Sequence, residues 1–111
     1  MTDARFNFEL SDLCVIAILA GGDSYGYQIN QELLEVMEMS ESSLYPILKK
    51  FERQGIVEGY SIEQGGRLRR YYRLTQNGRL TLEDARRKWS ALRNWLDKKF
   101  ENGEAENNEQ G

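Results

Sequence analysis

Residues 40–78 read SESSLYPILKKFERQGIVEGYSIEQGGRLRRYYRLTQNG, and this stretch decides the fold. Two runs that favour β-structure, 57–62 and 69–74, lie on either side of a double glycine. They follow a segment whose apolar residues are spaced by three and four, as on one face of a helix: Leu44, Ile47, Leu48 and Phe51. An amphipathic helix followed at once by a hairpin predicts an α+β winged helix-turn-helix.

The two ends of this helix carry different signals. Gly55 followed by an isoleucine predicts a Schellman end, because glycine readily adopts the left-handed conformation. Pro46 leaves the start open: it removes a hydrogen bond if the helix begins at Glu41 but lies in the first turn if the helix begins after Ser43. We therefore expect an irregular or slightly bent start. The hydroxyl groups that can cap the helix are those of Ser40, Ser42 and Ser43.

Charge is segregated along the chain although the net charge is only −3. Residues 1–39 carry one basic and seven acidic side chains, and residues 40–80 carry eight basic and four acidic ones. Residues 81–100 carry six basic and three acidic side chains, and residues 101–111 carry four acidic ones. A positive face on an acidic molecule attracts phosphates despite the total.

The polar face of the helix at 41–54 and the cationic hairpin after it predict DNA binding. Small polar residues allow close approach to base edges, a tyrosine donates to phosphate, and lysines and arginines add salt-dependent attraction. The structural alternatives are a solvated helix face, which Glu41 favours, and an edge hairpin protected by its charges. Three arginines close to the double glycine argue against the second alternative. The candidate DNA-binding residues are Ser40, Ser42, Ser43, Tyr45, Lys49, Lys50, Arg67, Arg69 and Arg70.

The N-terminal part predicts two further helices. Ser11 or Asp12 can cap a first helix that ends at about Ala20. Apolar residues surround this helix so fully that we expect it at the centre of the domain. Asp23 or Ser24 can cap the second helix.

The last predicted helix is long, from a cap at Thr75 to about Phe100. Its apolar stripe is too long for one thin domain to cover, which indicates a partner helix from a second copy. We therefore divide the chain into a winged helix-turn-helix domain at 1–75, a dimerisation helix at 76–101 and a disordered acidic tail at 102–111. The stripe comprises Leu82, Ala85, Trp89, Leu92, Trp95, Leu96 and Phe100.

The aromatic residues of this stripe have two interpretations. Packing in a dimer interface is the commoner use of such residues. Alternatively, two copies of Trp89 that face each other across a dimer axis form a flat apolar slot for a planar aromatic ligand.

The composition argues against an enzyme. With no histidine and one cysteine, Cys14, the chain offers neither the usual zinc ligands nor a Ser-His or Cys-His pair, so we expect no metal and no cofactor. No glycine pattern matches a phosphate-binding loop. No signal peptide or apolar segment of membrane-spanning length is present, so a cytoplasmic protein without a membrane partner is predicted.

These residues resemble the PadR family of bacterial transcriptional regulators in its short form. The resemblance covers most of residues 10–100. The matching elements are Ser24-Tyr25-Gly26-Tyr27, Ser43-Leu44-Tyr45-Pro46-Ile47-Leu48, Glu52-Arg53-Gln54-Gly55-Ile56-Val57, Gln64-Gly65-Gly66-Arg67, Arg70-Tyr71-Tyr72-Arg73-Leu74-Thr75 and Gly78.

The resemblance implies a homodimeric repressor that dimerises through its last helix and is released by small molecules such as phenolic acids or drugs. Multidrug-sensing members hold planar drugs in a pore between subunits, on a tryptophan that is followed by serine, and Trp89-Ser90 stands at that place. The implied ligand site comprises Trp89 and Leu92 with Val15 of the first helix. One departure is Ser42, where many relatives have glycine.

The prediction is therefore a sequence-specific transcriptional regulator that binds a pseudo-palindromic operator as a homodimer. Its two recognition helices would enter successive major grooves about 34 Å apart. A small planar aromatic effector at the dimer interface would release it. The alternative is a winged-helix dimer that acts as a protein-interaction module.

Overall fold

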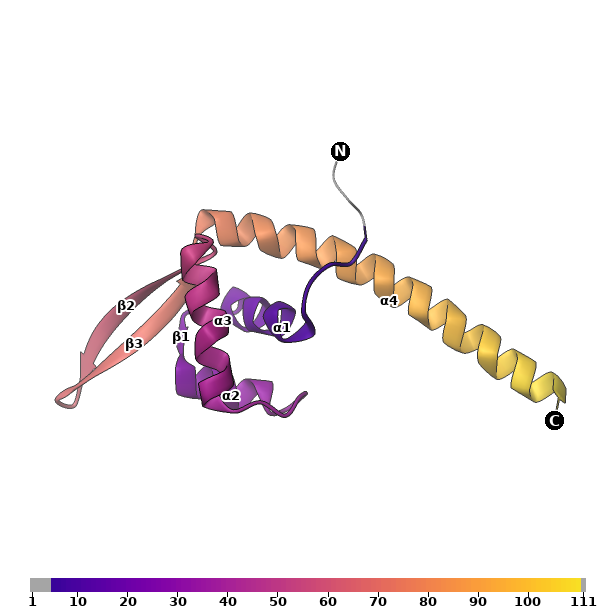
Figure 1. Ribbon diagram of the computed structural model, residues 1–111, viewed down its shortest axis with the longest axis horizontal. Coiled ribbons are helices and arrows are strands. Elements are labelled where there is room, and N and C mark those ends of the chain that lie inside the picture. The colour runs from indigo at the N-terminus through magenta and orange to yellow at the C-terminus, as the bar shows by residue number, and fades with distance from the viewer. Residues whose placement is uncertain (1–4, 111) are drawn as a thin grey trace.

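The computed structural model describes residues 5–110, and one long helix runs along one edge of its other elements (Figure 1). Three short helices gather beside the first part of that helix, the hairpin projects at one end, and the rest of the long helix extends away at the other. The molecule measures 65 × 36 × 20 Å. The elements are α1 (Leu10–Ala20), β1 (Ser24–Tyr25), α2 (Gly26–Leu33), α3 (Glu41–Arg53), β2 (Val57–Gln64), β3 (Arg67–Leu74) and α4 (Gln76–Gln110).

The core lies where α1, α2 and α3 meet the base of the sheet. Helix α1 contributes side chains to it on more than one side and contacts α2, β3 and α4, which confirms the prediction that it is central. The apolar face predicted for α3 is buried at Leu44, Leu48 and Phe51, with Ile47 packed at the edge. The other core residues are Val15, Ile16, Leu19, Ile29, Leu33, Ile56, Val57, Tyr72 and Leu74.

The sheet has three antiparallel strands in the order β1-β3-β2. The hairpin is longer than predicted, because β2 continues to Gln64 and β3 begins at Arg67. Only Gly65 and Gly66 remain for the turn, and both have a positive φ, +56° and +82°. Two consecutive left-handed residues match the right-handed twist of the flanking strands, so the turn requires its glycines. The short strand β1 was not predicted.

Of the first three predicted helix starts, two are wrong and one is confirmed. Helix α1 begins at Leu10, so Ser11 and Asp12 lie in its first turn and do not cap it. Helix α2 begins at Gly26, so Tyr25 occupies its N-cap position, without a capping hydrogen bond from its side chain, and Ser24 lies one residue further out in β1. Ser40 caps α3: its hydroxyl oxygen accepts a hydrogen bond from the backbone N–H of Ser43 at 3.2 Å.

Helix α3 is continuous from Glu41 to Arg53, with Pro46 inside it. Its end is the predicted Schellman motif: the Ile56 N–H donates to the Phe51 carbonyl at 2.9 Å, and the Gly55 N–H donates to the Glu52 carbonyl at 3.1 Å. Gly55 has a φ of +71°, as this motif requires. The chain thus leaves α3 directly into β2.

Helix α4 begins as predicted, because the Thr75 hydroxyl oxygen accepts a hydrogen bond from the Gly78 N–H at 2.9 Å. It does not end near Phe100 but continues to Gln110. The sequence predicts a disordered tail at 102–111, whereas the structure extends α4 through residues 102–110, and residue 111 lies outside the described part of the chain. Residues 101–110 contain no proline, and adding residues to an existing helix costs far less than starting one.

Candidate nucleic-acid interface

The side of α3 that faces away from the core is polar and open. Ser42, Ser43, Tyr45 and Lys49 are all exposed there, and Tyr45 keeps 43% of its surface. The Ser40 hydroxyl lies 3.0 Å from the Ser42 hydroxyl and 2.9 Å from that of Ser43, so three hydroxyl groups cluster at the helix start. Small polar groups at this end leave room for another molecule to approach the helix.

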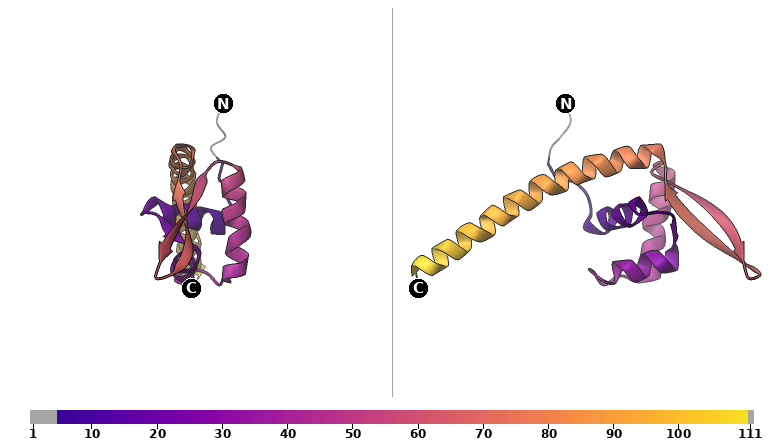
Figure 2. Two further views of the ribbon diagram at one scale, coloured as in Figure 1. Left: turned by 90° about the vertical axis from the view of Figure 1, so that its left-hand side faces the viewer. Right: turned by 180° about the vertical axis from the view of Figure 1, so that it is seen from behind.

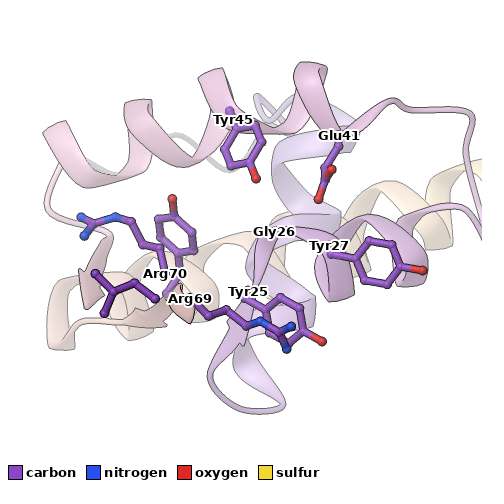
Figure 3. A pocket seen from close by; sticks show the side chains of 9 residues that line it. Tyr25, Gly26, Tyr27, Glu41, Tyr45, Arg69 and Arg70 are labelled. Atoms are coloured by element: carbon purple, nitrogen blue, oxygen red, sulfur yellow. The ribbon is translucent and has the colours of Figure 1, made fainter. Parts of the chain in front are cut away.

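Tyr45 connects this surface to the start of α2. A Cβ atom at Gly26 would lie 3.0 Å from the Tyr45 hydroxyl oxygen, so the tyrosine ring packs closely over the glycine backbone. Between α3 and β3 lies a pocket of about 270 Å³ (Figure 3). Its lining comes from four elements: Tyr25, Gly26, Tyr27, Glu41, Tyr45, Leu68, Arg69, Arg70 and Tyr72.

The two adjacent lysines of α3, both predicted to meet DNA, have separate environments. Lys49 is exposed on the outer face. The Lys50 ammonium pairs with the Asp12 carboxylate of α1, because the 100° step between neighbouring helix residues turns Lys50 towards the body of the domain. Lys50 therefore joins two helices, and Lys49 supplies charge to the outer surface.

The arginines of the hairpin also differ in their partners. Arg67 and Arg69 are exposed. Arg70 points to the other side of the strand, where its guanidinium donates to Glu52 of α3 at 3.2 Å and lies 5.8 Å from the ring of Tyr72. Arg70 therefore holds the hairpin against α3, although half of its side chain stays exposed.

Burial raises the pKa of the Tyr72 phenol above its usual value, and the Glu52 carboxylate raises it further. Both effects favour the neutral phenol, since an ionised one would be poorly solvated beside a carboxylate. Tyr72 is thus an uncharged platform beneath Arg70.

The sequence-based reasoning missed three residues of this surface: Tyr25, Tyr27 and Leu68. Tyr27 and Leu68 are large side chains that the structure leaves exposed, and both line the pocket. The signal was present in Tyr25-Gly26-Tyr27, where a glycine between two aromatic residues at a helix start indicates close approach of another group. The position of the Tyr25 ring beside Arg69 depends on the pairing of β1 with β3.

The residues predicted to bind a ligand or to form the dimer interface fall into a buried group and a partly exposed group. Val15 and Ala85 are 0% exposed, and Leu82 packs against the same core. Val15, predicted for a ligand site, and Ala85, predicted for a dimer interface, are thus fully buried within one chain, in which α1 and α4 contact each other. Trp89 keeps 39% of its surface, Trp95 56% and Phe100 64%, while Leu92 and Leu96 are half-buried.

The segment before α1 lies against α4 beside Trp89. The Phe6 ring meets the Trp89 ring edge-on, with 6.2 Å between centroids. The buried Lys88 ammonium donates to the Asn7 side chain at 3.2 Å and pairs with Asp84 at 3.0 Å. A shallow, mainly apolar groove of about 410 Å³ lies next to these contacts. It is lined by Arg5, Phe6, Lys88, Ala91, Leu92 and Trp95.

The described part of the chain shows neither a metal-binding cluster nor a membrane-spanning helix. Among the side chains of residues 5–104, no cluster of three or more cysteine, aspartate or glutamate residues is arranged to hold a metal ion. No helix in this part of the chain is both long and apolar enough to cross a membrane. Burial raises the pKa of the Cys14 thiol, which disfavours the reactive thiolate.

Comparison with known families supports the arrangement of helix, hairpin and long C-terminal helix. The model of the "Transcriptional regulator PadR-like family" matches residues 15–84, which include α2, α3, the whole hairpin and the start of α4. The chain belongs to the PadR-like family of transcriptional regulators. Proteins of this family are regulators of transcription and not enzymes, which confirms the prediction on that point.

Solved structures of PadR-like proteins have the same fold. A Streptococcus mutans protein is 37% identical, with a TM-score of 0.80 over 87% of this chain and 92% of that chain. A PadR family transcription regulator from Clostridium difficile is 27% identical, with a TM-score of 0.76 over 83% of this chain and 99% of that chain. Bacillus subtilis PadR, solved in complex with operator DNA, is 26% identical, with a TM-score of 0.63 over 70% of this chain and 47% of that chain.

Proposed function

We propose that this PadR-like protein is a cytoplasmic, homodimeric repressor that binds a specific DNA operator. The observation that carries the proposal is the pocket between α3 and β3, because Tyr45 of the helix and Arg69 of the hairpin line it together (Figure 3). The outer face of α3 and the hairpin therefore border the same hollow at the surface of the molecule. A duplex that receives α3 in a groove meets the hairpin along its backbone.

The roles follow from the contacts within the chain. Ser42, Ser43 and Tyr45 approach base edges and sugar-phosphate, and Lys49 adds charge at the next turn of α3. Arg67 and Arg69 lie along phosphates or enter a narrow minor groove. Arg70 is held by Glu52 and serves mainly to set the angle of the hairpin.

The dimer is proposed to form through α4. Trp95 and Phe100 are exposed apolar residues on a helix whose second half extends away from the other elements (Figure 2). Two such helices that pack together bury both aromatic residues and place two copies of α3 on the same side, as a two-fold symmetric operator requires. Residues 1–75 then read DNA, and residues 76–101 hold the dimer.

The proposed effector is a small planar aromatic molecule beside Trp89 and Leu92. Trp89 is partly exposed although Phe6 covers one edge of it, and the apolar groove continues from Leu92 to Trp95. A flat apolar molecule between two copies gains stacking on both tryptophan rings. It would alter the separation of the two DNA-binding units and so release the operator.

Binding to labelled DNA from upstream of the protein's own gene tests the proposal, with a scrambled duplex beside it and a series of salt concentrations. We expect tighter binding to the native duplex and a steep loss of affinity with salt. Arg67→Ala with Arg69→Ala should flatten the salt dependence, since each lost phosphate contact lowers the slope by about 0.9. Arg86→Ala, an exposed arginine of α4, is the matched control and should bind as the wild type does.

Equal affinity of the double variant and the wild type would contradict the assignment of the hairpin. Equal, weak binding of the wild type to both duplexes, repeated with other DNA from the neighbouring genes, would favour a dimer that acts as a protein-interaction module.

A further inference from the structure

A row of three tyrosines crosses the side of the sheet that faces away from the core. The strand register places Tyr25 of β1 opposite Tyr71 of β3, and Tyr71 opposite Tyr60 of β2. The ring centroids of Tyr25 and Tyr71 are 5.2 Å apart, and those of Tyr71 and Tyr60 are 5.8 Å apart. The row therefore ties the hairpin to Tyr25, the residue that directly precedes α2.

An arginine lies over each end of this row. The Arg69 guanidinium carbon is 4.3 Å from the Tyr25 ring centroid, and that of Arg73 is 4.9 Å from the Tyr60 ring centroid. Both distances are within the range of a cation–π interaction. Arg69 is diagonal to Tyr25 across the strand pair, the position from which a long side chain reaches a ring.

The two ends of the row differ in charge. Arg73 pairs with Glu58 at 2.5 Å, and the Tyr60 hydroxyl donates to Asp23 at 2.5 Å, so carboxylates compensate that end. No carboxylate among residues 5–104, whose side chains the structure describes, pairs with Arg69. Its guanidinium rests on an aromatic face and keeps its charge available for an anion from outside.

We propose that Tyr25 is a positioning residue for DNA binding, which acts by holding the Arg69 guanidinium at the edge of the pocket beside α3. The inference rests on the proposed function and adds a role for a residue outside α3 and the hairpin. A free arginine loses rotamer freedom when it contacts a phosphate, and a ring that already restricts it lowers that cost. Because Tyr25 adjoins α2, the ring also fixes Arg69 relative to the helix-turn-helix.

The adjacent Arg70 has a different partner and a different role from Arg69. Alternate residues of a strand point to opposite faces, so Arg70 lies on the other side, over Gly59 and paired with Glu52. Arg70 thus holds the hairpin in place, whereas the Tyr25 ring holds Arg69 in position for DNA (Figure 3).

The experiment compares Tyr25→Ile with Tyr25→Phe, each with and without Arg69→Ala, on the labelled upstream duplex. Isoleucine suits a strand but has no ring, whereas phenylalanine keeps the ring. Tyr25→Ile should weaken binding about two- to fivefold for each hairpin, the factor that corresponds to an exposed cation–π contact, and Tyr25→Phe should stay close to the wild type. The salt slope of Tyr25→Ile should match the wild type, because the charge of Arg69 remains.

In the Arg69→Ala background, Tyr25→Ile should cause no further loss, since nothing remains for the ring to position. The same loss in both backgrounds would mean that the ring acts through the packing of β1 and would overturn the inference. If Arg69→Ala weakens binding but Tyr25→Ile equals Tyr25→Phe, the positioning role is wrong and the proposed function stands. A wild-type protein with no preference for any of the native duplexes overturns both.

Discussion

Gly78→Ala should destabilise this protein strongly, although alanine is the better helix former. Gly78 is buried in the first turn of α4, where the helix crosses the end of α3. A Cβ atom there would lie 2.1 Å from the carbonyl oxygen of Ile56, well inside the 3.0 Å that such contacts respect. The obstacle is backbone, which cannot rotate aside as a flexible side chain can.

The same carbonyl holds the junction together. It accepts hydrogen bonds from the Thr75 N–H at 3.0 Å and from the Thr75 hydroxyl at 3.1 Å, so moving it weakens both. Overpacking costs about 1–3 kcal/mol, and each weakened hydrogen bond costs about 1 kcal/mol. The better helix preference of alanine offsets about 1 kcal/mol of this cost, which leaves a net loss of about 2–4 kcal/mol. For a domain of this size, that lowers Tm by roughly 10–20 °C.

Thermal unfolding followed by circular dichroism at one protomer concentration measures this effect, because the stability of a dimer depends on concentration. Gly103→Ala is the control: Gly103 is also in α4, but a Cβ atom there meets nothing within 4 Å, so Tm should stay the same or rise slightly. A Tm for Gly78→Ala equal to or above the wild type would refute the close packing of α4 on Ile56.

Two further substitutions test the site. Lys50→Met should lower Tm and leave DNA affinity unchanged in the folded protein, because it strips the partner from Asp12, which is only 13% exposed, at a cost of about 1–3 kcal/mol. Lys49→Met should leave Tm unchanged and weaken DNA binding, with a salt slope smaller by about 0.9 for each copy. If Lys49→Met lowers Tm and Lys50→Met lowers the salt slope, the two lysine environments are wrong. Trp89→Phe should abolish quenching of tryptophan emission by planar aromatic compounds while Trp95→Phe retains it. Quenching that survives Trp89→Phe in a dimer would place the ligand elsewhere.

Local patterns determined most of the fold, because they act within a few residues of one another. The spacing from Leu44 to Phe51 identified the buried face of α3, and Gly55 identified its end. The double glycine located the turn of the hairpin, and Thr75 located the start of α4. Signals of this kind are set by backbone geometry and short-range hydrogen bonds, so the sequence alone was sufficient to predict them.

The ends of elements without such a signal were less predictable. Residues 102–110 are polar and acidic, a composition that favours disorder, yet the structure continues α4 through them. Strand β1 has only two residues and exists because β3 pairs with it. Neither outcome follows from local composition.

Only the tertiary structure decided which member of a neighbouring pair faces outwards and which is used within the chain. Lys50 and Asp12 are 38 residues apart in the sequence, and the docking of α1 on α3 alone brings them together. Arg70 and Glu52 also meet only through the packing of the hairpin on α3. Arg69, on the opposite face of β3, contacts the Tyr25 ring instead. Charge and periodicity predicted which faces are polar and which are apolar. The partner of each side chain depends instead on contacts between segments that are distant in the sequence, and local patterns do not predict such contacts.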